Sequence, residues 1–99
     1  MQEIIFIHVG QAGIQIGQAL WELLYYQHQL PGGQFGELNP ESPGIDVIFK
    51  EVEEGRYLPR AVFADLEPSV IDEFKKSEIG QLMDQNQFIS GKRDSGNNY

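Results

Sequence analysis

Three glycines stand where the chain changes from a strand-like pattern to a helix-like one. Gly10, Gly13 and Gly17 lie within the stretch IIFIHVGQAGIQIGQALWELL (residues 4–24). A glycine inside a helix costs about 1 kcal/mol relative to alanine. Glycines this close together therefore need a compensating reason: a tight turn, a backbone pressed against a ligand, or a helix packed closely on a sheet.

The residues on either side of this turn predict a strand and a helix. Residues 3–9 are apolar on both faces, which is typical of a parallel strand covered on both sides: Ile4, Phe6 and His8 on one face, and Ile5, Ile7 and Val9 on the other. From residue 11 to about residue 28, apolar residues recur at helical steps: Ala12, Ile16, Ala19, Leu20, Leu23 and Leu24. Gly13 and Gly17 fall on the stripe of Leu20 and Leu24, so we expect the helix to lie close to its sheet.

The rest of the chain alternates loops with short apolar runs. Residues 29–46 are rich in Pro, Gly, Asn and Ser, which predicts a long surface loop. Extended pieces follow at residues 47–52 and 57–58, and residues 61–65 predict a buried strand that ends in an acid. Residues 69–76 begin with a Ser-x-x-Asp capping pattern and end on two lysines, as a short helix would. A third strand is predicted at residues 87–90, so the fold class is α/β with a parallel sheet.

Composition narrows the possible partners. The chain has 99 residues, a formal net charge of −8 and no cysteine. The negative charge argues against nucleic acid or an anionic membrane as a partner. No apolar run reaches the roughly 18 residues of a membrane span, and no secretory signal is visible. The absence of cysteine favours a reducing compartment. A nucleotide stays possible, because backbone N–H groups and a metal ion can hold phosphates.

Three loops could share one ligand. In an open parallel sheet, ligands bind outside the carboxyl ends of the strands. The loops VGQAG, DLEPS and GKRDSGNN would meet there. They offer glycine N–H groups and these polar side chains: Gln11, Gln15, Asp65, Glu67, Asp94, Ser95 and Asn97. The set suits a phosphate tail with Mg²⁺, which prefers carboxylates, waters and phosphate oxygens.

Each of these signals also has a plainer explanation. GQAGIQIG matches neither the dinucleotide fingerprint nor the P-loop, so packing explains its glycines equally well. Asp65 and Glu67 flank Pro68 at a helix start, where acids commonly serve as caps. His8 is predicted to be a core residue or a support for the site. Trp21, Tyr25 and Tyr26 are predicted to be packing residues.

Taken together, three segments resemble the N-terminal part of tubulin. They are HVGQAGIQIG…WEL, PRAVFADLEPSVIDE and GKRDSGNNY, and the resemblance runs over nearly the whole chain. Within that family it is to α-tubulin, since Ala12 and Tyr99 stand where β-tubulins usually carry Cys and Trp. The resemblance implies the N-terminal portion (residues 1–99) of a Rossmann-like tubulin/FtsZ GTPase domain, with an incomplete parallel sheet.

The resemblance also implies a GTP and Mg²⁺ site built from the three loops. Residues 1–28 would hold the first loop, and residues 47–99 the second and third. Glu67 would lie at the magnesium ion and the γ-phosphate, with Asp65 nearby. The residues expected to contact GTP are Gly10, Gln11, Ala12, Gln15, Asp65, Glu67, Asp94, Ser95, Gly96 and Asn97.

The family implies a structural, GTP-binding subunit that polymerises with β-tubulin into the microtubules of the cytoplasm. This chain departs from the family pattern in carrying Gln2 for the usual Arg. It also has no lysine between Gln27 and Phe49, so the luminal acetylation of α-tubulin is not expected.

The sequence stops at Tyr99, before the GGGTGSG-type phosphate loop, the base-binding and ribose-binding loops, and the acid that promotes hydrolysis. We therefore expect a fragment or truncated product whose sheet has an uncovered face. Two alternatives stay open: a piece that binds no nucleotide alone and acts as an interaction fragment, and a minimal GTPase, which the missing loop disfavours.

Overall fold

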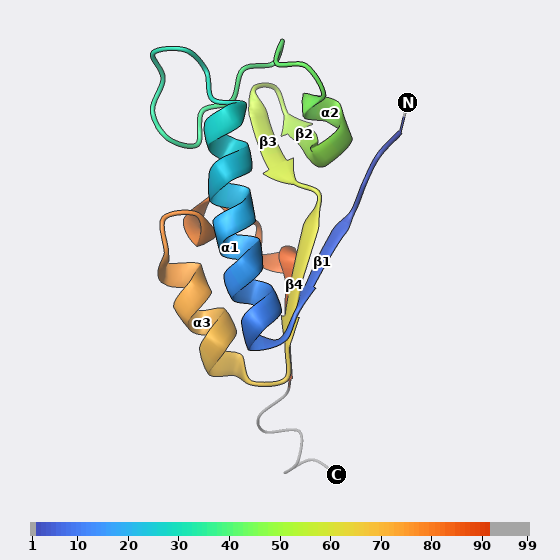
Figure 1. The fold of residues 1–99 in the computed structure, drawn as a ribbon, viewed down its shortest axis with the longest axis vertical. Coiled ribbons are helices and arrows are strands. Elements are labelled where there is room, and N and C mark those ends of the chain that lie inside the picture. Colours follow the sequence, from blue (N-terminus) through green and yellow to red (C-terminus); the bar gives the residue numbers. More distant parts are fainter. Residues whose placement is uncertain (1, 92–99) are drawn as a thin grey trace.

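The centre of the fold is a three-stranded parallel sheet with β4 (Ala61–Asp65) in the middle (Figure 1). β1 (Phe6–Val9) pairs with one edge of β4 and β5 (Phe88–Ser90) with the other. A computed structural model describes residues 2–91, and Asp94, Ser95, Gly96 and Asn97 lie outside that range. The α/β class and the parallel sheet predicted from the sequence are confirmed.

Two helices cover one face of this sheet. α1 (Gly10–Gln27) packs on β1 and β4, while α3 (Pro68–Lys76) packs on β4, on β5 and beside α1 (Figure 1). Within the described part of the chain, no helix is both long and apolar enough to cross a membrane.

A separate antiparallel hairpin precedes β4. It consists of β2 (Phe49–Glu53) and β3 (Arg56–Pro59), joined by a turn at Gly55, whose φ is +80°. The short helix α2 (Ile45–Ile48) leads into it, so the first predicted extended piece begins as a helix. In the stretch predicted as a loop, an isolated antiparallel bridge joins Gln29 to Leu38, and the last two residues of that stretch, Ile45 and Asp46, belong to α2.

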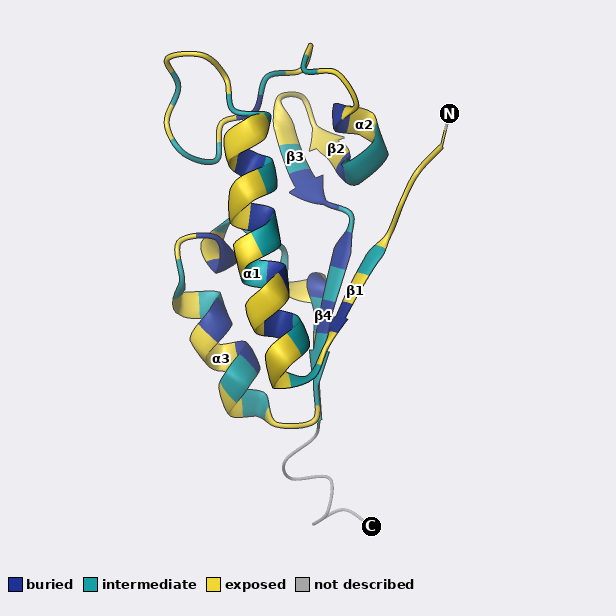
Figure 2. Ribbon diagram, in the orientation of Figure 1, coloured by how far each residue is buried: buried dark blue, intermediate teal, exposed yellow. Residues whose placement is uncertain are grey.

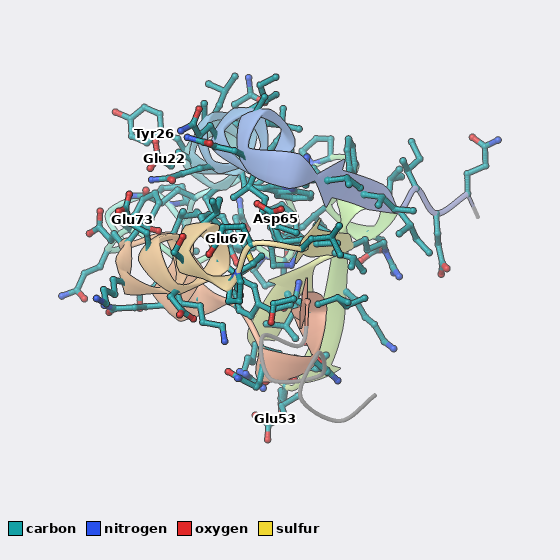
Figure 3. All side chains as sticks on the ribbon, turned by 90° about the horizontal axis from the view of Figure 1, so that it is seen from below. Glu22, Tyr26, Glu53, Asp65, Glu67 and Glu73 are labelled. Carbon is teal, nitrogen blue, oxygen red and sulfur yellow. The ribbon has the colours of Figure 1, made fainter. Side chains whose placement is uncertain are left out.

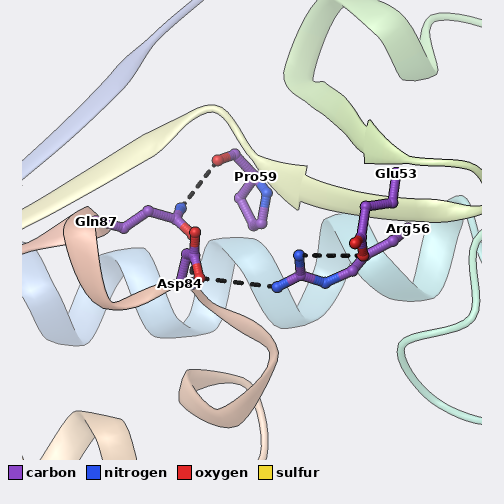
Figure 4. Close-up of polar contacts among 5 residues, drawn as sticks. All are labelled: Glu53, Arg56, Pro59, Asp84 and Gln87. Carbon is purple, nitrogen blue, oxygen red and sulfur yellow. Dashed lines mark hydrogen bonds and ion pairs between the residues drawn. The ribbon is translucent and has the colours of Figure 1, made fainter.

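Two 3₁₀ turns, η1 (Gly80–Leu82) and η2 (Gln85–Gln87), connect α3 to β5. The buried Gln87 amide donates to the carbonyls of Pro59 and Ala61, at 3.0 and 3.1 Å. Arg56 forms ion pairs with Glu53 and Asp84, at 3.7 and 3.8 Å (Figure 4). Together these contacts fix η2, and with it the start of β5, against the hairpin.

The buried residues lie where α1 and α3 face the sheet (Figure 2). Aromatic rings make up much of this core. Trp21 is fully buried, and it packs edge to face with Phe6 and Phe49, with ring centroids 5.3 and 5.4 Å apart. Its indole N–H donates to Nε2 of the buried His8, at 3.0 Å. The predicted core role of His8 is therefore confirmed, and burial lowers the pKa of its imidazole.

The predicted apolar stripe of α1 is wrong for most of its members. Four of them are exposed: Ala12, Ile16, Ala19 and Leu23. The buried positions are instead Ile14, Gly17, Trp21 and Tyr25. The helix carries two apolar stripes, and the one with the larger aromatic rings is buried because it removes more surface from water. Tyr26 lies outside that stripe, so its predicted packing role is also wrong.

The coverage predicted for β1 is wrong on one side. β1 is an edge strand, and the side chains of its Ile7 and Val9 are exposed, as is that of Ile5 just before it. The cause is that no element among residues 2–91 lies on that face of the sheet. The uncovered face expected for an incomplete sheet is therefore present.

Candidate functional site

The carboxyl ends of the three parallel strands lie together at one end of the molecule (Figure 1). β1 passes directly into α1 at Gly10, whose φ of +78° favours glycine. β4 leads through Leu66 and Glu67 into α3. Two of the three predicted loops thus come together, and the third falls almost wholly outside the described residues.

A groove of about 470 Å³ runs between α1 and α3 from this end. Three predicted site residues, Gln11, Gln15 and Glu67, line it. Ile14 and Phe74 contribute apolar lining. Seen from below, Asp65 and Glu67 lie close together at the start of α3 (Figure 3).

A second hollow, of about 380 Å³, adjoins the same strand ends. Gly10 and Asp65 line this hollow rather than the groove. Ala12 is exposed and lines neither. The first two loops therefore divide their predicted residues between two neighbouring depressions.

The carboxylates of Asp65 and Glu67 also stabilise the start of α3, the capping role that the sequence offered as the simpler explanation. Asp65 Oδ1 accepts the backbone N–H of Glu67, and Glu67 Oε1 accepts that of Ser69, both at 3.1 Å. Glu67 is thus the N-cap of α3, and Pro68 takes the first helical position, which suits its fixed φ. The Ser69 cap predicted from the sequence is wrong.

The N-terminus of α1 is the other feature of this end. Among the described residues no side chain caps it, and its first turn contains no acid. The first N–H groups of a helix have no partner within the helix, and the helix dipole places partial positive charge there. Such an end can bind phosphate.

The groove is lined by acidic side chains, so an anion needs a cation beside it in order to bind there. Glu67 and Glu73 both line it, and its described lining includes no lysine, arginine or histidine. A phosphate would meet repulsion from these carboxylates unless a cation lay between them. Within residues 2–91 no three acidic or histidine side chains form a metal cluster, so Mg²⁺ at Glu67 would keep waters and phosphate oxygens as its other ligands.

Sequence reasoning missed four polar residues of the groove: Gln18, Ser69, Glu73 and Ser77. A signal existed for the first three. Gln18 lies three and seven residues after Gln15 and Gln11, which places all three on one side of α1. Ser69 and Glu73 are four apart on α3.

Comparisons with known proteins agree with this architecture. The model of the family described as Tubulin/FtsZ family, GTPase domain, matches residues 3–99. The tubulin alpha-1 chain of Pelvetia fastigiata is 47% identical over 103 residues, and the tubulin alpha-2 chain of Schizosaccharomyces pombe is 44% identical over 105. The tubulin alpha-2 chain of Caenorhabditis elegans is 44% identical over 101 residues. The alignments cover 100% of this chain but only 22–23% of these relatives, so the chain spans less than a quarter of their length.

Proposed function

Because this chain belongs to the tubulin/FtsZ family, we propose that it carries the phosphate-binding end of a GTP site in an α-tubulin-like subunit. The observation that supports this most strongly is the uncapped N-terminus of α1 beside Asp65 and Glu67. Backbone donors and acidic groups meet there at the carboxyl ends of parallel strands, where ligands bind in open α/β sheets.

We assign the phosphates to the first turn of α1, where the N–H groups of Gln11 and Ala12 follow Gly10. The amide of Gln15, one turn further along the groove, would donate to phosphate or ribose oxygens. Mg²⁺, when bound, neutralises phosphate charge, and Glu67 would hold it through its carboxylate or a water. Asp65 supports this arrangement through its bond to the Glu67 backbone.

The third loop completes the proposed phosphate contacts. Its residues lie outside the described part of the chain, and their role rests on the family match alone: Asp94, Ser95, Gly96 and Asn97.

In a longer protein that contains this chain, we propose assembly with β-tubulin into microtubules of the cytoplasmic cytoskeleton. The similarity to tubulin alpha chains supports this. We assign nucleotide binding to this chain, and no hydrolytic step.

A calorimetric titration of the 99-residue chain with Mg-GTP and Mg-ATP tests the proposal. We expect weak binding, with a dissociation constant above about 100 μM, and no preference between the two nucleotides, because the groove supplies phosphate contacts but no evident guanine pocket. Gln15→Ala should weaken binding further, because it removes the side-chain amide assigned to the nucleotide, while Gln27→Ala, at the far end of the same helix, should not. Equal effects of the two substitutions would contradict the assignment.

A further inference from the structure

The imidazole of His8 joins the two elements that carry the proposed phosphate site. His8 lies on β1 and is 8% exposed. Its Nε2 accepts the indole N–H of Trp21 on α1, at 3.0 Å. Its ring stacks on Phe63 of β4, with ring centroids 5.0 Å apart and an angle of 23° between the planes. α1 begins at the proposed phosphate-binding turn and β4 leads to Glu67, so this one buried ring contacts both elements.

Only a few residues separate His8 from each half of the site. Gly10, the first residue of α1, follows it by two positions. In the register of β1 and β4, His8 lies beside Phe63, and Asp65 follows Phe63 by two positions. The Asp65 carboxylate in turn accepts the backbone N–H of Glu67, at 3.1 Å. A displaced imidazole would therefore shift the start of α1 relative to the Glu67 loop.

Two contacts on α1 fix the helix against this ring. At Gly17 the ring and the helix touch closely, since a Cβ atom there would lie 2.7 Å from Cγ of His8. The bond from Trp21 adds direction. An indole N–H can only donate, so Nε2 of His8 must be an acceptor and the neutral ring carries its proton on Nδ1. Gly17 thus sets the distance of α1 from the sheet, and the Trp21 bond sets the rotation of α1 about its axis.

We propose that His8 is a positioning residue of the phosphate site: it holds the first turn of α1 at the spacing from Glu67 that a phosphate and its Mg²⁺ require. This inference rests on the proposed function. His8 lines neither the groove nor the 380 Å³ hollow, so it acts through α1 and β4 and not by touching the nucleotide. A residue that only filled the core would affect the free energy of unfolding but not the affinity of the folded chain.

Two substitutions separate the hydrogen bond from the filling of the core. His8→Met and His8→Gln introduce unbranched side chains of nearly equal length, but only glutamine offers a carbonyl oxygen to Trp21. Titration with Mg-GTP, followed by amide NMR under conditions where each variant is folded, measures the affinity. We expect His8→Met to raise Kd at least about fivefold, and His8→Gln to stay within about twofold of the unsubstituted chain.

A second variant without the bond is His8→Asn, whose amide is one methylene shorter than that of glutamine. It should weaken binding as His8→Met does. The indole N–H resonance of Trp21 should shift in both of these variants and return towards its original position in His8→Gln. Dispersed amide resonances report that each variant is folded.

Leu38→Ala is the matched control for lost stability. Leu38 is a buried core residue that forms a bridge with Gln29, beyond the far end of α1. Its truncation should destabilise the chain, because it leaves a cavity in the core. It should nevertheless leave Kd within about twofold of the unsubstituted value.

The outcomes separate the role of His8 from the site itself. Unchanged affinity in His8→Met and His8→Asn would overturn the positioning role while the site stands. Equal weakening by His8→Gln or by Leu38→Ala would do the same. If the unsubstituted chain shows no shifts with Mg-GTP, the proposed site is refuted, and the role of His8 with it.

Discussion

Gly17 is the position where the packing of α1 on the sheet is most constrained. A Cβ atom at Gly17 would lie 2.7 Å from Cγ of His8, 2.8 Å from Nδ1 and 2.9 Å from Cδ2. The imidazole is poorly placed to move, because it accepts the Trp21 N–H and stacks on Phe63 with ring centroids 5.0 Å apart.

The expected change in the free energy of unfolding for Gly17→Ala follows from these contacts. Forcing a methyl group against the ring costs about 1–3 kcal/mol of strain. If the ring turns away instead, the buried Trp21 N–H loses its acceptor, at a similar cost of about 1–3 kcal/mol. Alanine returns about 1 kcal/mol through its helix propensity. Gly17→Ala should therefore lower the free energy of unfolding by up to about 2 kcal/mol.

Gly13 provides a matched control on the same helix. A Cβ atom there would lie 3.5 Å from the nearest atom, the carbonyl carbon of His8, which is an ordinary contact. Gly13→Ala should therefore gain helix propensity and stabilise the chain by up to about 1 kcal/mol. Urea unfolding at low micromolar concentration, followed by the fluorescence of Trp21, measures both. If Gly17→Ala stabilises as much as Gly13→Ala, the proposed steric constraint at His8 does not exist.

Three further predictions concern the core. Burial lowers the pKa of His8 below its ordinary value of 6.5, so at acidic pH the unfolded chain takes up a proton that the folded chain does not. The urea midpoint should therefore fall as the pH drops below about 6.5. It should fall less in the His8→Asn variant. Gln87→Leu should lower the free energy of unfolding by about 2 kcal/mol, because it leaves the carbonyls of Pro59 and Ala61 without their donor. Gln85→Leu, at an exposed position of the same turn, should have little effect in the same urea assay. The buried Tyr25 hydroxyl has no hydrogen-bond partner among the described residues, so Tyr25→Phe should leave the thermal midpoint unchanged or raise it, and a clear fall would reveal a partner.

Much of the fold was predictable because its signals are local. The run from Phe6 to Val9, the glycine turn and the helical spacing after it predict β1 and α1, and the AVFAD run predicts β4. The parallel arrangement follows from a strand, loop and helix in that order. The predicted bounds are right within a few residues because Gly10 and Pro68 each favour one place for a helix to begin.

The errors arose where two local patterns competed. α1 carries one stripe through Ile16 and Leu23 and another through Ile14, Trp21 and Tyr25, and spacing cannot choose between them. Ring size and the bond from Trp21 to His8 decide which stripe is buried, and that bond joins residues 13 positions apart. The coverage of β1 likewise depends on which other elements lie on each face of the sheet, which its own sequence does not encode.

The candidate site was predictable as a set of loops but not as a shape. Loop order and strand direction bring Gln11 and Glu67 to one groove, as expected. Glu73 was missed because its role depends on how α3 lies beside α1, a relation between segments distant in sequence.

The central claim is that phosphate binds at the first turn of α1, beside Glu67. Backbone amide NMR of the ¹⁵N-labelled chain during titration with Mg-GTP tests it most directly. We expect the largest shifts at the amides of Gln11, Ala12 and Gly13 and at those of Glu67 and Ser69, with no shift at the hairpin turn of Gly55. Chelation of Mg²⁺ should abolish the shifts in both segments. Shifts that centre on the hairpin, or that persist unchanged without Mg²⁺, would contradict the account.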